Sequence, residues 1–159
     1  MKDFTAIVRT LTVEQFNEIL AASSRQAREI YFHRHSIRAT QKSHHLPKPG
    51  QKNEQRAQML YDVLKNNNDD QLCEELLRSF LLTKRSLLAK ALDHLAIPHK
   101  DGLTDSDDVS KFEQLNAEQI RALVKDLTLV APPHEICIYL KFMGAPSVDE
   151  ALAEPNGPT

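Results

Sequence analysis

The sequence is poor in glycine and aromatic residues: it has four glycines, no tryptophan and 6% aromatic residues in 159 positions. Glycine-rich phosphate loops, Walker patterns and dinucleotide fingerprints need closely spaced glycines, and none of these motifs is present. No segment sustains the two-residue alternation of a half-buried strand. Leu, Ala, Glu, Gln and Lys are plentiful instead. This composition favours helices over sheets.

Cysteine and long apolar runs are also scarce. Cys73 and Cys137 lie far apart in apolar segments, so we expect two small buried thiols in a reducing compartment rather than a disulfide. No apolar run approaches the ~20 residues that cross a bilayer, and the first nine residues lack the apolar core of a secretion signal. We therefore expect a cytoplasmic protein without a membrane partner, and we expect no cofactor and no metal site.

The charges are sorted along the chain although the net charge is only −2. Residues 1–56 contain ten Lys/Arg and five Asp/Glu, whereas residues 101–159 contain four Lys/Arg and eleven Asp/Glu. Like charges gathered on one surface produce a field that selects partners, while interspersed charges screen one another within a Debye length of ~10 Å. A partner surface is therefore the main functional indication of this sequence.

Capping patterns and apolar stripes predict a helical framework. A short polar residue precedes an acid or amide by three positions at four helix starts: Thr12–Gln15, Asn68–Gln71, Asn116–Gln119 and Ser147–Glu150. Apolar residues at three- and four-residue steps predict helices over 13–32, 54–65, 72–95, 117–129 and 134–142, with short ones near 105–115 and 148–153. Residues 4–11 read as a possible short strand without a partner.

These elements predict an all-α protein with a single helical, bundle-like domain of about six helices over residues 1–153. The apolar stripe over residues 72–95 is interrupted at Thr83-Lys84-Arg85, so either one helix continues through these residues or two helices meet there. We favour one long helix at the centre of the core, ended by Pro98 because proline disrupts a helix interior. A mobile basic loop at residues 36–52 should separate the first and second helices. Residues 154–159 should form a flexible tail.

The basic segment at residues 25–56 contains eight Lys/Arg, two Asp/Glu and four histidines. One interpretation is a solvated linker whose charge serves solubility. A second is an arm that binds the phosphates of nucleic acid or another anion; its candidate residues are Arg34, Arg38, Lys42, Lys48 and Lys52. A third is a metal site of His33, His35, His44 and His45, which we rank last because no cysteine is near and neither pair has i, i+4 spacing.

The acidic part and the remaining histidines carry no recognisable catalytic motif. Asp101, Asp105, Asp107 and Asp108 lack the ligand spacing of a calcium loop and are better explained by helix capping. A catalytic site would need side chains such as His94, His99, His134 and Glu135 to converge in space. We therefore expect the protein not to be an enzyme.

The sequence predicts a helical protein–protein interaction or assembly module that is able to self-associate. The segment 134–142 is apolar nearly all round, so it suits a core or interface better than a DNA-reading helix. The predicted interface consists of Ile136, Tyr139, Leu140 and Phe142, and a second patch consists of Val13, Phe16 and Leu20. The partner is another protein or a second copy, which the basic and acidic ends would orient in a homodimer. The alternative is a nucleic-acid accessory protein that uses the basic segment.

Overall fold

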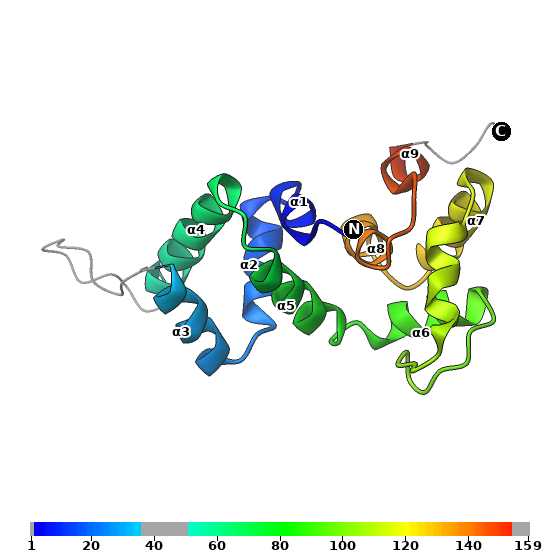
Figure 1. Cartoon of the computed structure of the whole chain (residues 1–159), viewed down its shortest axis with the longest axis horizontal. Coiled ribbons are helices and arrows are strands. Elements are labelled where there is room, and N and C mark those ends of the chain that lie inside the picture. The colour runs from blue at the N-terminus through cyan, green and yellow to red at the C-terminus, as the bar shows by residue number, and fades with distance from the viewer. Residues whose placement is uncertain (1, 36–50, 154–159) are drawn as a thin grey trace, which may run out of the picture. The chain divides into compact units, whose positions relative to one another are not determined.

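The computed structural model describes the backbone of residues 2–35 and 51–153, and the side chains of residues 2–35 and 54–153 (Figure 1). These residues form nine α-helices and one 3-10 helix, and within them the only β-type pairing is an isolated bridge between Lys100 and Leu103. The predicted all-α fold is confirmed. Residues 36–50 of the predicted basic loop lie outside the described residues, and so does the predicted tail at residues 154–159.

The helices gather into two compact units, an N-terminal unit that ends at Thr83 and a C-terminal unit that begins at Lys84. The sequence predicts one domain. This grouping does not decide between one domain and two, because a domain is defined by folding as one cooperative unit. None of the described helices combines the length and the hydropathy that a bilayer span requires.

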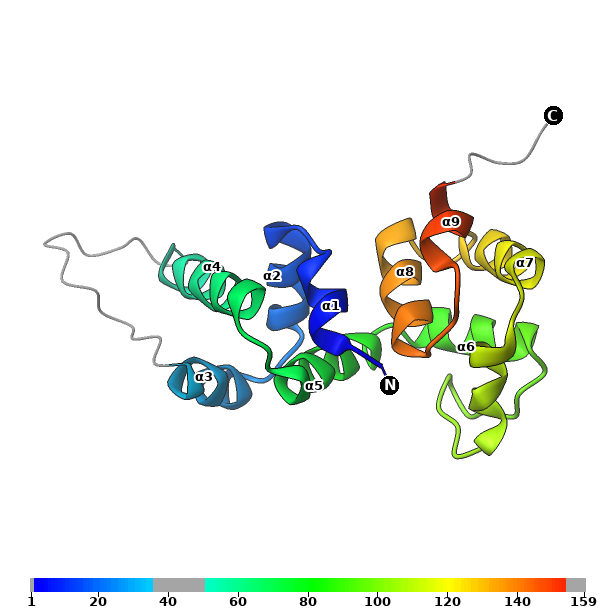
Figure 2. The same cartoon turned by 45° about the horizontal axis from the view of Figure 1, so that its top comes forward.

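The N-terminal unit is built around contacts of α1 and α2 with α4 and α5 (Figure 2). Its helices are α1 (Phe4–Arg9), α2 (Val13–Ala21), α3 (Arg25–Arg34), α4 (Gln51–Asn66) and α5 (Asp70–Leu81). Its largest fully buried side chains are Phe16, Ile19, Leu60, Leu64, Leu72, Leu76 and Leu77. These side chains come from the apolar stripes of α2, α4 and α5, as amphipathic spacing predicts.

The segment at residues 4–11 is a helix rather than a strand. The Asp3 carboxylate accepts a hydrogen bond of 2.8 Å from the Ala6 N–H and so caps α1. The Thr5 N–H donates to the Asp70 carboxylate at 2.9 Å, which ties the start of α1 to the start of α5. Six helical residues are enough here because Ile7 and Val8 are buried.

The predicted helix over residues 13–32 is wrong, because α2 ends at Ala21 and α3 begins at Arg25. Ser24 caps α3 by accepting from the Ala27 N–H at 3.1 Å, and a serine in this role competes with helix continuation. The predicted start of α2 is confirmed: Thr12 and Gln15 exchange hydrogen bonds of 3.0 and 3.1 Å in a capping box.

The C-terminal unit contains α6 (Arg85–His94), the 3-10 helix η1 (Asp107–Gln114), α7 (Ala117–Leu127), α8 (Pro133–Phe142) and α9 (Val148–Ala153). Helix α7 contacts α6 and α9, and α8 contacts α9. The fully buried side chains of this unit include Phe112, Ile120 and Leu123. Asn116 and Gln119 form the second capping box at the start of α7.

The predicted single helix over residues 72–95 is also wrong. Helix α5 ends at Leu81 and α6 begins at Arg85, with a break at the boundary between the units. The Thr83 hydroxyl donates to the Phe80 carbonyl at 2.6 Å, and Lys84 has non-helical backbone angles of φ −104° and ψ 51°. The apolar stripe itself is confirmed, since Leu76, Phe80 and Leu88 are buried.

Candidate functional site

A pocket of about 180 Å³ lies in the N-terminal unit between α2 and α3. The residues that line it are Asn17, Leu20, Ala21, Arg28 and Phe32. Asn17, Leu20 and Ala21 share one face of α2 because they are three and four positions apart. Arg28 and Phe32 are one turn apart on α3 for the same reason. The break between the two helices allows these two faces to meet.

Arg28 is fixed across the end of α2. Its Nη1 donates to the Ala21 carbonyl at 3.3 Å and to the Ser23 carbonyl at 2.8 Å. These carbonyls belong to the last turn of α2 and its exit, where helical partners run out. Arginine has five N–H donors, and among the described residues Nε and Nη2 of Arg28 donate to none. Donors therefore remain at the pocket for a carboxylate or another anion.

Phe32 is held in place by Arg56 of α4. The Arg56 guanidinium lies over the Phe32 ring at 4.0 Å from its centroid, within the range of a cation–π interaction. Arg56 Nη1 and Nη2 also donate to the two carboxylate oxygens of Glu29 at 2.9 and 3.0 Å. The Phe32 side chain is 3% exposed and Arg56 is 8% exposed. One wall of the pocket is therefore rigid.

The size and lining of the pocket indicate what it can hold. Pockets for cofactors and drug-sized ligands have volumes of roughly 300–1,000 Å³, so this pocket suits one side chain better. Among the described residues that line it there is no acid, histidine, cysteine or serine, so these residues offer no nucleophile and no general base. Apolar walls from Leu20, Ala21 and Phe32 next to an arginine suit an apolar group beside a negative charge.

Of the predicted anion-binding residues, the structure describes the side chain of Arg34 alone. Arg38, Lys42 and Lys48 lie outside the described residues, and Lys52 is in the first turn of α4 with its side chain outside them. Arg34 is exposed, and its Nη1 lies 3.6 Å from an Asp69 carboxylate oxygen. The phosphate-binding arm stays a prediction.

Asp69 also joins α3 to α5 within the N-terminal unit. His35, which follows α3, places Nε2 at 2.8 Å from the Asp69 carboxylate, and this carboxylate accepts from the Leu72 N–H at 3.1 Å as the cap of α5. Burial alone would raise the pKa of Asp69. The hydrogen bonds from Leu72 and His35 and the positive charge of Arg34 outweigh burial and hold the pKa below its ordinary value.

The predicted interface residues on α8 belong mostly to the interior. Ile136, Tyr139 and Leu140 are buried, and Phe142 is half-buried. Tyr139 packs edge-to-face against Phe112 with ring centroids 5.7 Å apart, and burial raises the pKa of Tyr139. These contacts neither establish nor remove a partner surface, so this interface stays a prediction.

The second predicted patch touches the pocket. Phe16 is buried against Tyr61, with ring centroids 5.4 Å apart, and Val13 is half-buried. Leu20 is 3% exposed and lines the pocket. One residue of this patch thus belongs to the candidate site.

Two of the histidines considered for catalysis, His94 and His99, lie in separate hydrogen-bonded pairs of the C-terminal unit. His94 Nδ1 lies 3.1 Å from Asp126, and His99 Nε2 lies 2.8 Å from Asp93. The His94 hydrogen bond lowers the pKa of Asp126. A base paired with a carboxylate would still need a nucleophile or bound substrate, and no such arrangement is evident around these pairs in the described residues.

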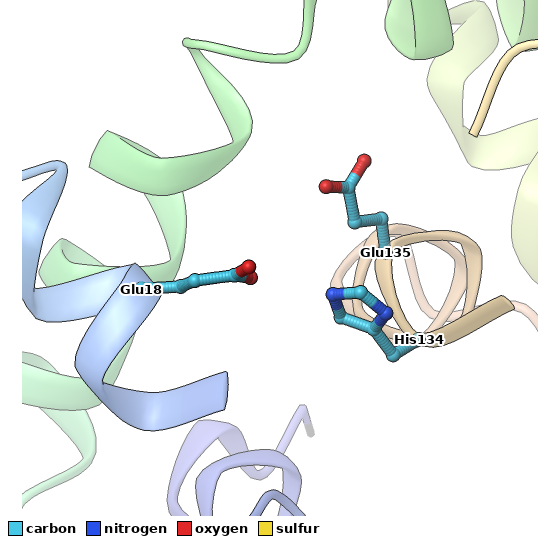
Figure 3. Close-up of side chains that lie close together, drawn as sticks. All are labelled: Glu18, His134 and Glu135. Carbon is cyan, nitrogen blue, oxygen red and sulfur yellow. The ribbon is translucent and has the colours of Figure 1, made fainter. Parts of the chain in front are cut away.

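Glu135 is buried and pairs with Lys84 at 2.7 Å, whereas His134 is half-buried beside it (Figure 3). The figure also draws Glu18, which belongs to α2 of the N-terminal unit, while His134 and Glu135 begin α8 of the C-terminal unit. Within either unit, the described residues bring no three His, Cys, Asp or Glu side chains close enough to share an ion.

Both cysteines are free. Cys73 is fully buried, as predicted, and burial raises the pKa of its thiol to about 11. Cys137 is half-buried rather than buried, and desolvation raises its pKa as well. A raised pKa keeps a thiol protonated and unreactive, so neither cysteine has the character of a nucleophile.

Sequence reasoning missed Asn17, Ala21, Arg28 and Phe32 as residues of one site. The available signal was the pair Ser23–Ser24, whose second serine precedes an arginine by four positions. A serine cap there indicates a new helix, which would turn Arg28 back toward the end of the preceding one. Comparisons of this chain with protein-family models, with curated proteins and with solved structures find no match.

Proposed function

We propose that the protein is a non-enzymatic helical module that binds another protein through the pocket between α2 and α3. The observation that carries this proposal is the pocket itself, which has the size of one side chain, apolar walls and an arginine with unused donors. A partner would insert one large apolar side chain and place a carboxylate beside Arg28. Burial of apolar area would supply affinity, and the charge pair would supply orientation.

Two contacts support this proposal because they prepare the pocket before a partner arrives. Arg28 is already bound to two carbonyls, and Phe32 is already covered by Arg56. Association costs less when the side chains at the interface are ordered beforehand, since less conformational entropy is lost on binding. A preformed pocket with apolar and cationic parts is a common anchor point of protein interfaces, in which arginine and aromatic residues are enriched.

Nuclear magnetic resonance of the ¹⁵N-labelled full chain tests the proposal with acetyl-Asp-Leu-Asp-amide as the probe. We expect millimolar binding, with the largest amide shift changes at Asn17, Ala21 and Phe32. Acetyl-Asp-Ala-Asp-amide should bind more weakly, because it cannot fill the pocket.

The matched variants for this experiment are Ala21→Leu, which fills the pocket, and Ala122→Leu, which adds the same side chain to an exposed position on α7. Ala21→Leu should abolish the shift changes, and Ala122→Leu should leave them unchanged. Equal binding of both probes, shift changes elsewhere in the chain, or none at all would overturn the proposal.

The second proposal is binding of nucleic-acid phosphates by the basic segment. Its support is the sequence composition, with eight Lys/Arg against two Asp/Glu over residues 25–56. Binding to a duplex should weaken steeply with added salt, and no binding at low salt would remove this proposal. We also propose a cytoplasmic location, which the two free cysteines support, because disulfides are rare in reducing compartments.

A further inference from the structure

The C-terminal unit exposes an apolar side chain in an acidic loop. Leu103 is 44% exposed and lies between the exposed residues Asp101 and Asp105. Asp107 and Asp108 follow at the start of η1 and are also exposed. This loop therefore combines the two properties that the α2–α3 pocket selects, a single apolar side chain and nearby carboxylates.

The loop is held in one conformation by its backbone. Lys100 and Leu103 exchange two hydrogen bonds, of 2.8 and 3.0 Å, and the Gly102 N–H donates to His99 Nδ1 at 3.1 Å. The Thr104 hydroxyl donates to the Pro98 carbonyl at 2.6 Å. These bonds on both sides of Leu103 fix the direction in which it is presented, so little entropy is lost when it enters a pocket.

Gly102 seats the loop against α6. Its φ is +80°, which favours glycine, and a Cβ at this position would lie 2.7 Å from the Leu88 Cβ. The loop backbone therefore packs directly on the helix. Leu103 is exposed although the neighbouring Gly102 packs against Leu88 of α6.

We propose that Leu103 of one copy of this chain inserts into the α2–α3 pocket of a second copy. Asp101 or Asp105 then accepts a hydrogen bond from the unused donors of Arg28. This inference rests on the proposed function and names its partner as a second copy. The argument for that partner is complementarity of both shape and charge, because each copy carries one acidic loop with an exposed leucine and one pocket with an arginine. Two such contacts related by a two-fold axis would close the dimer.

Sedimentation velocity of the full chain over a range of concentrations tests this dimer. We expect reversible association of the natural chain. Leu103→Ala should raise the dissociation constant at least about tenfold, because the inserted side chain is lost from both contacts. The control is Leu129→Ala, which removes a leucine that is 75% exposed in the turn after α7 and outside the acidic loop. This control should dimerise like the natural chain.

A mixing experiment separates loop from pocket. Leu103→Ala retains the pocket and loses the loop contact, whereas Ala21→Leu retains the loop and fills the pocket. Each variant alone should be monomeric where the natural chain dimerises. An equimolar mixture should regain association, because the loop of one variant fits the pocket of the other. Recovery in the mixture also shows that both variants are folded.

The outcomes that would overturn this inference differ from those that would overturn the proposed function. A natural chain that stays monomeric, or a dimer that Leu103→Ala leaves unchanged, removes the dimer contact. If acetyl-Asp-Leu-Asp-amide still binds the pocket of that monomer, the partner is a different protein and the proposed function stands. If the peptide does not bind either, both proposals fail.

Discussion

Glu29→Ala should destabilise the N-terminal unit more than Arg56→Met does, although both variants remove the same ion pair. The two partners differ in burial: the Arg56 side chain is 10% exposed, whereas the Glu29 side chain is 54% exposed. Removal of the carboxylate leaves a guanidinium inside the protein without its acceptor. Removal of the guanidinium leaves a carboxylate that water can solvate. The asymmetry follows from the cost of a buried charge without a partner.

The magnitudes can be worked from the contacts. Glu29→Ala leaves the donors of Nη1 and Nη2 without their carboxylate, and Nε of Arg56 already has no hydrogen-bond partner among the described residues. A buried polar group left unsatisfied costs about 1–3 kcal/mol, and water that reaches the exposed side of Glu29 places the expected loss at about 1–2 kcal/mol. Arg56→Met loses the cation–π contact with Phe32 but keeps an apolar side chain beside the ring and removes the Nε that has no described partner, so we expect a net loss below about 1 kcal/mol.

Urea unfolding of the full chain, followed by circular dichroism, measures both free energies. The double variant Glu29→Ala, Arg56→Met should cost about as much as Arg56→Met alone, because no buried charge remains to be stranded. The reasoning is refuted if Glu29→Ala costs less than Arg56→Met, or if the two losses simply add. The natural chain at the same pH and salt concentration is the reference for all three variants.

Three further substitutions test the fold. Asp69→Asn should destabilise the protein by about 1–2 kcal/mol at neutral pH. The pKa of Asp69 is lowered from 3.8, so the ionised carboxylate contributes its full stability above that value. In a pH series of urea titrations, the difference from the natural chain should vanish as the pH falls through the lowered pKa. Tyr61→Phe removes the buried donor of the Leu11 carbonyl and should cost about 1–2 kcal/mol in the same assay. Gly102→Ala places a Cβ 2.7 Å from that of Leu88 at a φ of +80°, so we expect a lower melting temperature and a loss of about 1–3 kcal/mol; an unchanged melting temperature would contradict the close packing of this loop.

The starts of α2 and α7 were predictable from the sequence, whereas the breaks before α3 and α6 were not predicted. The patterns at Thr12–Gln15 and Asn116–Gln119 are capping boxes in the structure. Both missed breaks contain three residues, 22–24 and 82–84. Buried residues on the two sides of each break are whole turns apart: Leu20 and Tyr31 are eleven positions apart, and Phe80 and Leu87 are seven positions apart, which is about three and about two helical turns. The apolar stripe therefore continues in phase across each break, and periodicity alone does not detect it.

The candidate site was harder to predict than the fold, because it depends on one of these breaks. Arg28 and Phe32 approach Leu20 only once α3 turns away from α2, and a continuous helix over residues 13–32 would separate them along its axis. No short motif records a pocket that two helices form together. Spatial convergence of this kind is invisible to spacing rules.

The uneven distribution of charge along the sequence has to be counted again over the two structural units. The segment 3–83 contains eleven Lys/Arg and ten Asp/Glu, so the basic excess of the first 56 residues is largely cancelled by the acids of α4 and α5. The segment 84–159 contains eight Lys/Arg and twelve Asp/Glu and keeps its acidic excess. In the proposed complex, the orientation of a partner would therefore depend on a local cation such as Arg28 more than on a charge difference between the two ends of the chain.

The hydrogen bonds from Arg28 to the Ala21 and Ser23 carbonyls couple occupancy of the pocket to fraying of α2. A side chain of the next helix binds carbonyls at the end of α2, so unwinding there requires these hydrogen bonds of Arg28 to break. A guest that binds the outer nitrogens and leaves Nη1 in place would slow amide hydrogen exchange in that turn, whereas a guest that pulls the guanidinium away would accelerate it. Arg28 therefore both lines the pocket and stabilises the end of α2.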